Sequence, residues 1–86
     1  MRVVVVYKQQ TDYARQVEDY MADFKRQTGH DLEVLDPESR DGISFCGAYD
    51  ILEYPTLIAI SDDGQIQNQW RGLPLPTMSE VSYYVS

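Results

Sequence analysis

Cysteine and histidine, the side chains that most often act as nucleophiles, bases or metal ligands, each occur once in this 86-residue chain. The chain has one cysteine, Cys46, and one histidine, His30. A lone cysteine cannot form an internal disulfide, so Cys46 is either an incidental structural thiol or a reactive or partner-linking one. His30 has no cysteine or second histidine near it in the sequence, so we predict no metal site.

Acidic and hydroxyl side chains fall where backbone roles explain them. Asp62 and Asp63 precede Gly64, which is more typical of a tight turn than of a cation site. Asp12 could serve as a general base, but its place before a predicted helix favours a capping role. The Thr11 hydroxyl is a poor nucleophile without a neighbouring base, and the histidine lies beyond the far end of that helix.

Length and charge narrow the classes of function. Eighty-six residues allow one hydrophobic core, so we predict a single domain over residues 1–86. The net charge is −7 and the seven basic residues are scattered, so we expect neither nucleic acid nor an anionic membrane as a partner. The first apolar run is too short for a signal peptide or a membrane span, and the lone cysteine gives no sign of secretion. The expected location is therefore the cytoplasm.

The pattern of apolar residues predicts an α/β chain with the order β-α-β-α-β-β-α. Strands are predicted at residues 3–7, 31–35, 56–60 and 66–70, the last two joined by a hairpin turn at residues 62–65. A helix between the first two strands indicates a crossover and a parallel pair. We therefore expect a mixed four-stranded sheet with flanking helices.

The three predicted helices have different signals. The first has an apolar stripe whose members are Tyr13, Val17, Tyr20, Met21 and Phe24. Thr11 or Asp12 is expected to cap its start, and Gly29 to end it. A short second helix is expected at residues 45–52, with Phe45, Tyr49 and Leu52 on its inner face, because Gly42 and Gly47 interrupt a longer one.

The third predicted helix begins at a capping box, in which Thr77 and Glu80 satisfy each other's free amides. Its apolar residues are expected to pack on the sheet, and these are Met78, Val81 and either Tyr84 or Val85.

The second half of the chain resembles a thioredoxin. The stretch "AYDILEYPTLIAISDDGQIQNQWRG" has the tyrosine and aliphatic residue that end a thioredoxin helix, an X-Pro-Thr that opens a strand, and the glycines of the following hairpin. The matching residues are Tyr49, Ile51, Pro55, Thr56, Gly64 and Gly72. The resemblance implies a thioredoxin-like fold and a cis Tyr54–Pro55 bond.

The first half resembles a glutaredoxin, in which a lysine-containing turn leads into a Cys-Pro-Tyr-Cys motif. In "YKQQTDYARQ", Thr11 and Ala14 stand where the cysteines would be, and Tyr13 keeps the tyrosine. Dithiol exchange needs a thiolate and a resolving thiol two residues on, and neither residue can act as one. The strand-one carboxylate of thioredoxins and the Gly-Gly-Asp glutathione site of glutaredoxins are also missing, so no cofactor is expected.

The resemblance implies that three segments converge on one groove, where thioredoxins bind an extended peptide. The candidate groove residues of this chain are Thr11, Asp12, Tyr13, Tyr54, Pro55, Arg71, Gly72 and Leu73. Partial burial of the aromatic members against neighbouring helices is the alternative explanation.

Three hypotheses of function follow. The first is a redox-inactive thioredoxin-like domain that binds a protein or peptide through this groove. The second is a thiol-disulfide oxidoreductase that uses Cys46 or a partner's thiol. The third is a small assembly module that pairs through an outer helix face or the hairpin edge. The sequence does not determine the partner or the oligomeric state.

Overall fold

The computed structural model describes residues 1–85. The elements are β1 (Arg2–Val6), α1 (Ala14–Thr28), β2 (Glu33–Leu35), α2 (Arg40–Tyr49), β3 (Thr56–Ile60), β4 (Ile66–Arg71) and α3 (Met78–Ser82). This is the predicted order, and all four strands were expected within two residues of their observed ends.

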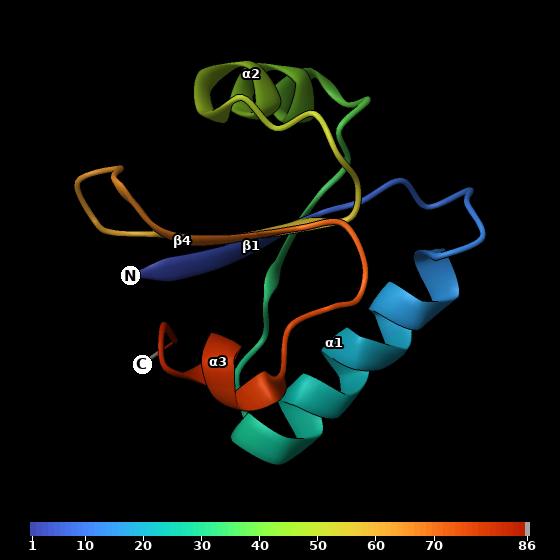
Figure 1. Ribbon diagram of the computed structural model, residues 1–86, viewed down its shortest axis with the longest axis vertical. Coiled ribbons are helices and arrows are strands. Elements are labelled where there is room, and N and C mark those ends of the chain that lie inside the picture. The colour runs from blue at the N-terminus through green and yellow to red at the C-terminus, as the bar shows by residue number, and fades with distance from the viewer. Residues whose placement is uncertain (86) are drawn as a thin grey trace.

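The strands form one mixed sheet in the order β2-β1-β3-β4. β1 runs parallel to β2, with Val5 opposite Val34, and antiparallel to β3, with Val4 opposite Ile58. β3 and β4 form an antiparallel hairpin with a bulge near Ala59. Helices cover both faces: α2 lies alone on one side of the sheet, and α1 and α3 lie on the other (Figure 1).

The core is divided by the sheet, because successive side chains of a strand point to opposite faces. Val3 and Val5 point to the side of α1 and α3, where they join a buried cluster that includes Phe24. Val4 and Val6 point to the side of α2, where they join a second buried cluster that includes Cys46. β1 is therefore the central strand, covered on both faces as its apolar run predicts.

The first helix ends as predicted but begins differently. Gly29 has φ 78°, and its N–H donates to a helix carbonyl at 2.7 Å, so it is the left-handed stop. The predicted cap by Thr11 or Asp12 is wrong, because Tyr13 occupies the N-cap position and no side chain caps the helix. The Thr11 hydroxyl instead donates to the Lys8 carbonyl at 2.8 Å, which closes the loop before the helix.

The second helix begins five residues before its predicted start and ends three residues before its predicted end. α2 begins after Ser39, whose hydroxyl oxygen accepts the Gly42 N–H at 3.0 Å. Gly42 and Gly47 lie inside the helix and do not interrupt it. The cap at Ser39 stabilises the first turn and allows the helix to include both glycines.

The predicted inner face of α2 is correct for two of its three residues. Phe45 and Tyr49 pack against the second buried cluster. Leu52 does not, because its side chain is 86% exposed. Asp50 adopts the left-handed conformation with φ 55° and ends the helix, so Leu52 no longer follows the helical face.

The predicted hairpin turn between β3 and β4 is confirmed. Gly64 has φ 87°, a conformation that glycine adopts without strain, and its N–H donates to the Ser61 carbonyl at 2.9 Å. Asp62 forms an ion pair with the N-terminal amine at 2.7 Å, across from the start of β1.

The predicted capping box of the last helix is also confirmed. The Thr77 hydroxyl oxygen accepts the Glu80 N–H at 3.2 Å, and the Glu80 carboxylate accepts the Thr77 N–H at 3.4 Å. Val81 is buried in the first cluster, and Met78, Tyr84 and Val85 pack against it as expected. None of the helices in residues 1–85 combines the length and apolar character that crossing a membrane requires.

Candidate functional site

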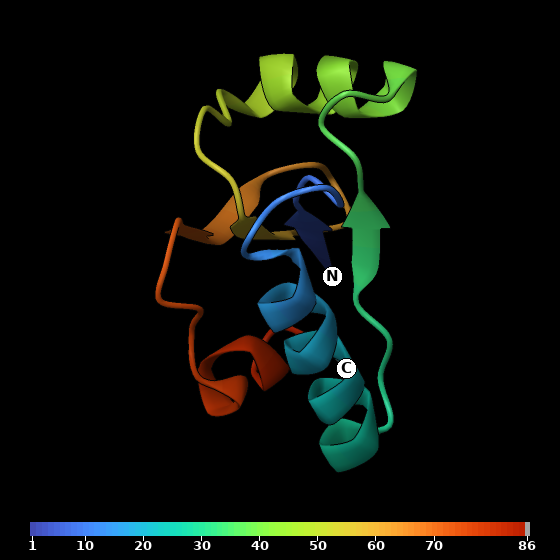
Figure 2. The same cartoon turned by 90° about the vertical axis from the view of Figure 1, so that its right-hand side faces the viewer.

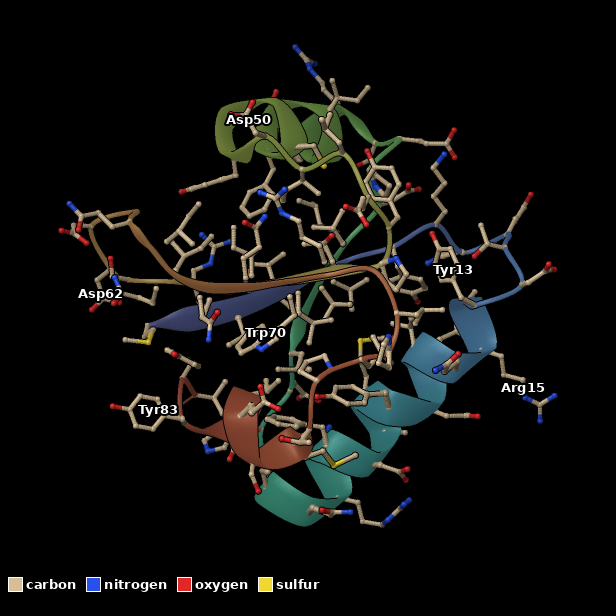
Figure 3. The ribbon with its side chains drawn as sticks, in the orientation of Figure 1. Tyr13, Arg15, Asp50, Asp62, Trp70 and Tyr83 are labelled. Carbon is tan, nitrogen blue, oxygen red and sulfur yellow. The ribbon has the colours of Figure 1, made fainter. Side chains whose placement is uncertain are left out.

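Three segments that are far apart in the sequence meet at one end of the sheet. They are the loop from β1 to α1, the turn that precedes β3, and the loop that follows β4, and the two views agree on this meeting point (Figures 1 and 2). Figure 3 shows Tyr13 at this end of the molecule, away from Asp62 and Tyr83 at the other. The candidate groove residues all belong to these three segments, except Arg71, which is the last residue of β4.

The loop from β1 to α1 is held by its own hydrogen bonds. The Tyr13 hydroxyl oxygen accepts the Lys8 N–H at 3.2 Å. The Thr11 carbonyl accepts the Ala14 N–H at 3.3 Å, and the Thr11 hydroxyl is engaged with the Lys8 carbonyl. Thr11 and Tyr13 therefore fix the shape of the loop. Asp12 is exposed between them.

A contact between Lys8 and Tyr54 joins this loop to the turn before β3. The Lys8 ammonium lies 5.3 Å from the centroid of the Tyr54 ring. A cation over an aromatic face at this distance contributes about 0.5–1 kcal/mol at an exposed site. The contact brings together two residues forty-six positions apart in the chain and orients the Tyr54 ring at the surface.

The turn before β3 is bonded to the loop after β4. The Tyr54–Pro55 and Leu73–Pro74 peptide bonds are both cis. The Pro55 carbonyl accepts the Gly72 N–H at 2.8 Å. Gly72 has φ 70°, a left-handed conformation that glycine adopts without strain and other residues rarely adopt.

The residues on either side of Gly72 are open to solvent. Leu73 is 50% exposed, and Arg71 is exposed with its guanidinium donating to the Gln69 side chain at 3.2 Å. The Gly72–Pro55 hydrogen bond therefore brings both side chains next to the turn before β3 without burying them.

The backbone of Tyr54 has free hydrogen-bonding groups. Within residues 1–85, neither its N–H nor its carbonyl takes part in a hydrogen bond, since β3 begins two residues later at Thr56. Thr56 itself is fully buried, and its hydroxyl donates to the Glu53 carbonyl at 2.6 Å. The turn is thus anchored on both sides of Tyr54, with the Tyr54 peptide groups free to bind.

The Cys46 thiol lies beneath Tyr54 in the second buried cluster. Burial raises the pKa of the Cys46 thiol, and the neighbouring Tyr54 hydroxyl lowers it by a smaller amount. Burial is also the largest cause of the raised pKa of Tyr54. A raised pKa and a covered sulfur are both unfavourable for a reactive thiolate.

Two surface hollows lie near these segments. One of 350 Å³ is lined by Lys8, Gln9, Gln10, Asp36 and Glu38, beside the loop from β1 to α1. A larger one of 700 Å³ lies between α1 and the segment that leads into α3, with Tyr20, Leu75 and Met78 among its lining residues. Tyr54 lines neither hollow.

Sequence reasoning missed three features of this end of the molecule. They are the Lys8–Tyr54 contact, the position of Cys46 beneath Tyr54, and the cis Leu73–Pro74 bond. Pro74 is a sequence signal for the cis Leu73–Pro74 bond, because cis peptide bonds occur almost only before proline. The other two are contacts between distant residues, for which the sequence has no local signal. No cluster of three or more potential metal ligands occurs in residues 1–85.

The chain is similar to solved structures, although its sequence matches no known family. No model of a known protein family matches the sequence. No curated protein matches it either. Among solved structures, thioredoxin 1 from the thermophilic eubacterium Thermosipho africanus TCF52B is similar, with a TM-score of 0.67. The match covers 99% of this chain and 90% of the thioredoxin chain. This chain has a thioredoxin-like fold.

The thioredoxin-like fold confirms the predicted fold class, including the mixed four-stranded sheet. The two sequences are 14% identical, so the similarity establishes the fold and not an activity. The assignment of the groove residues stays a prediction, and the geometry around Tyr54 is the basis for the proposal that follows.

Proposed function

We propose that this thioredoxin-like chain is a redox-inactive module that binds an extended peptide segment of a partner protein. The ligand would lie across the end of the sheet where Tyr13, Tyr54 and Leu73 are found. The free backbone groups of Tyr54 are the single observation that carries the proposal.

An extended peptide supplies the groups that the Tyr54 backbone lacks. A strand laid beside Tyr54 would donate one N–H to its carbonyl and accept its N–H, as in other cases of strand addition. The turn is held by the Gly72–Pro55 and Thr56–Glu53 hydrogen bonds, so little conformational entropy would be lost on binding.

The side chains around Tyr54 supply apolar contact. The Tyr13 and Tyr54 rings are partly exposed, and Leu73 is half-exposed. Tyrosine is enriched among residues that dominate binding energy, because a large ring is ordered at low entropic cost. Partial burial of Tyr13 and Tyr54 against the two core clusters supports this role, since it fixes the rings before a ligand arrives.

The chemistry of the site supports the absence of redox activity. The chain has a single thiol, which burial makes less acidic, and no second thiol to resolve a mixed disulfide. The Thr11 hydroxyl is committed to the Lys8 carbonyl. The proposal places the chain in the cytoplasm, where a lone cysteine stays reduced.

A binding experiment tests the first part of the proposal. A library of random peptides displayed on phage is selected on the immobilised chain, and the enriched peptides are synthesised and titrated. We expect Tyr54→Ala to weaken their binding about tenfold or more. Tyr83→Ala is the matched control, because Tyr83 is 81% exposed at the opposite end of the molecule (Figure 3).

Enrichment of no peptide, or equal binding by wild type and Tyr54→Ala, would overturn peptide binding at this site. A separate assay tests redox inactivity. Reduction of insulin disulfides by dithiothreitol should be no faster with the chain than without it. An acceleration that is lost in Cys46→Ala would contradict the proposal and favour a single-thiol oxidoreductase.

A further inference from the structure

The outer face of α2, which we define as Ile43, Ser44, Gly47 and Ala48, is exposed and uncharged. All four residues are open to solvent, and Ile43 is 62% exposed. From residue 42 to residue 49 the helix carries no charged side chain, in a chain whose net charge is −7. α2 lies alone on its side of the sheet, so no other helix covers this face (Figure 1).

The exposed side of α1 is very different. It carries a mixture of charges, and these are Arg15, Glu18, Asp19, Asp23, Lys25 and Arg26. A helix with one apolar side and one charged side is the usual pattern where the second side faces water. α1 follows that pattern and α2 does not, although both helices have one side packed on the same sheet.

Gly47 has no explanation in the packing of the chain itself. It lies inside α2 without a positive φ, and a Cβ built on it would meet no atom within 4 Å. Gly42 is different, because its Cβ would collide with the Asp36 carbonyl group. Glycine weakens a helix relative to alanine, so Gly47 lowers the stability of α2 although the chain's own contacts do not require a glycine there. Absence of a Cβ is useful where another molecule approaches the backbone closely.

The charges at the ends of α2 indicate what kind of molecule would bind its outer face. Arg40 lies at the N-terminal end beside Asp41, and Asp50 follows the C-terminal end. Asp41 is favourably placed in the field of the helix, whereas Arg40 and Asp50 are at the unfavourable positions for their signs. Neither residue is in an ion pair within residues 1–85. A second α2 laid antiparallel would place an opposite charge at each end.

We propose that the outer face of α2 is a self-association surface on which a second copy of this chain binds about a two-fold axis. With the axis crossing the outer face level with position 45 along the helix, Ile43 of one copy fits over Gly47 of the other, and Arg40 of one copy faces Asp50 of the other. Both pairs are symmetric about residue 45, so a single arrangement satisfies the apolar and the charged contacts together. Such a surface is self-complementary, as a two-fold dimer requires.

The contact is small, so the dimer is weak. Ten helical residues are about 15 Å long, and the face they present is well below the ~800 Å² per partner of a standard interface. We expect half of the chains to be dimeric somewhere between about 10 μM and 1 mM.

Sedimentation equilibrium of the full chain over this concentration range measures the association directly. A reducing agent is present throughout, so that a disulfide between two Cys46 thiols cannot produce a dimer. The expected result is a reversible rise in mean mass from monomer toward dimer as concentration increases.

Three variants locate the contact. Ile43→Lys should remove association over the whole range, because it places a charge against the same face of the second copy. Gly47→Ala should weaken association about tenfold, although the added methyl group has room in the monomer. Arg40→Glu should weaken it by about threefold to tenfold. Arg15→Glu makes the same charge change on α1, on the other side of the sheet (Figure 3), and should have no effect.

Two results would overturn the proposal. One is a mean mass that stays monomeric up to 1 mM, about the upper limit expected above. The other is a dimer that Ile43→Lys and Gly47→Ala leave unchanged, which would place the contact on another surface. Circular dichroism of each variant confirms that α2 is still formed. Peptide binding at Tyr54 does not depend on this surface, so either proposal can fail without the other.

Discussion

The two glycines of α2 provide a matched pair of substitutions with opposite expected effects. Gly42→Ala and Gly47→Ala add the same methyl group to the same helix, five residues apart. The structure predicts that the first destabilises the protein and the second stabilises the monomer. The difference arises entirely from what surrounds each added Cβ.

At Gly42 the added Cβ has no room. It would lie 2.7 Å from the Asp36 carbonyl carbon and 2.9 Å from the Ser39 hydroxyl oxygen, and closer still to the Asp36 carbonyl oxygen. These groups form the cap of α2, because Ser39 donates its hydroxyl and its N–H to that carbonyl at 2.6 and 3.0 Å. Loss of a cap costs about 1 kcal/mol and forced repacking about 1–3 kcal/mol. Alanine's better helix propensity recovers about 1 kcal/mol of this, so the net loss is about 2 kcal/mol.

At Gly47 the added Cβ meets nothing within 4 Å, so only helix propensity changes. The expected gain in free energy of unfolding is about 0.5–1 kcal/mol. A domain of this size has a total stability of roughly 4–13 kcal/mol, so both changes are measurable fractions of it. With about 4–8 °C per kcal/mol, Tm should fall by roughly 8–16 °C for Gly42→Ala and rise by roughly 2–8 °C for Gly47→Ala.

Urea unfolding followed by tryptophan fluorescence measures both changes. Trp70, the single tryptophan, packs edge-on against Tyr84 with ring centroids 5.6 Å apart, on the side of the sheet away from α2. Its signal therefore reports unfolding of the whole chain and not local fraying of α2. Low micromolar protein keeps the chain monomeric, so that self-association does not contribute.

Equal effects of the two substitutions would refute this reasoning. If Gly42→Ala left the free energy of unfolding within about 0.5 kcal/mol of wild type, the cap at Ser39 would not constrain the start of α2 as the structure indicates. If Gly47→Ala were clearly destabilising in the monomer, Gly47 would have a role within the chain and its use as evidence for self-association would be lost.

Three further predictions concern titrating groups. The Thr77 hydroxyl is the largest cause of the lowered pKa of Glu80, so the stabilisation from ionised Glu80 is present above its unfolded pKa and is lost as the pH falls. Thr77→Ala should lower the free energy of unfolding by about 1 kcal/mol at neutral pH. It should also make that free energy fall less steeply as the pH is lowered. The same fall in acid for wild type and variant would contradict the prediction. Burial raises the pKa of Tyr20 to about 12, and its hydroxyl has no partner within residues 1–85, so stability should fall as the pH rises from about 10 through 12. Tyr20→Phe should leave the free energy of unfolding unchanged or raise it by up to about 1 kcal/mol, and it should reduce the loss of stability at alkaline pH. A clear destabilisation would show that the Tyr20 hydroxyl has a hydrogen-bond partner. Burial of Cys46 predicts slow reaction with an aromatic disulfide reagent in the native protein and rapid reaction in urea; rapid native reaction would show an accessible thiolate.

Local signals predicted most of the fold. The β-branched runs, the left-handed Gly29, the turn at Gly64 and the capping box at Thr77 all lie where the sequence indicates. Each depends on interactions within about four residues, which are readable from the sequence because they need no knowledge of distant contacts. The order of elements follows from them, and the order restricts the topology to few choices.

The errors occur where a distant or unusual contact decides the local structure. Gly42 is typical of a helix break, but it lies inside α2, which begins after the Ser39 cap, and the Asp36 carbonyl leaves no room for a side chain there. Thr11 was expected to cap α1, but its hydroxyl closes the preceding loop. The sequence predicts Leu52 on the helix, but the left-handed Asp50 ends α2 two residues before it.

The sequence by itself determined the fold class and the absence of a dithiol motif. Apolar periodicity and turn chemistry dictate the elements, and a single cysteine cannot form a redox pair. Only the tertiary structure decided how Lys8, Cys46 and Tyr54 are placed together, and that Gly47 has open space above it. These facts depend on distances between residues that the folding of the sheet brings together, and no local pattern in the chain specifies such distances.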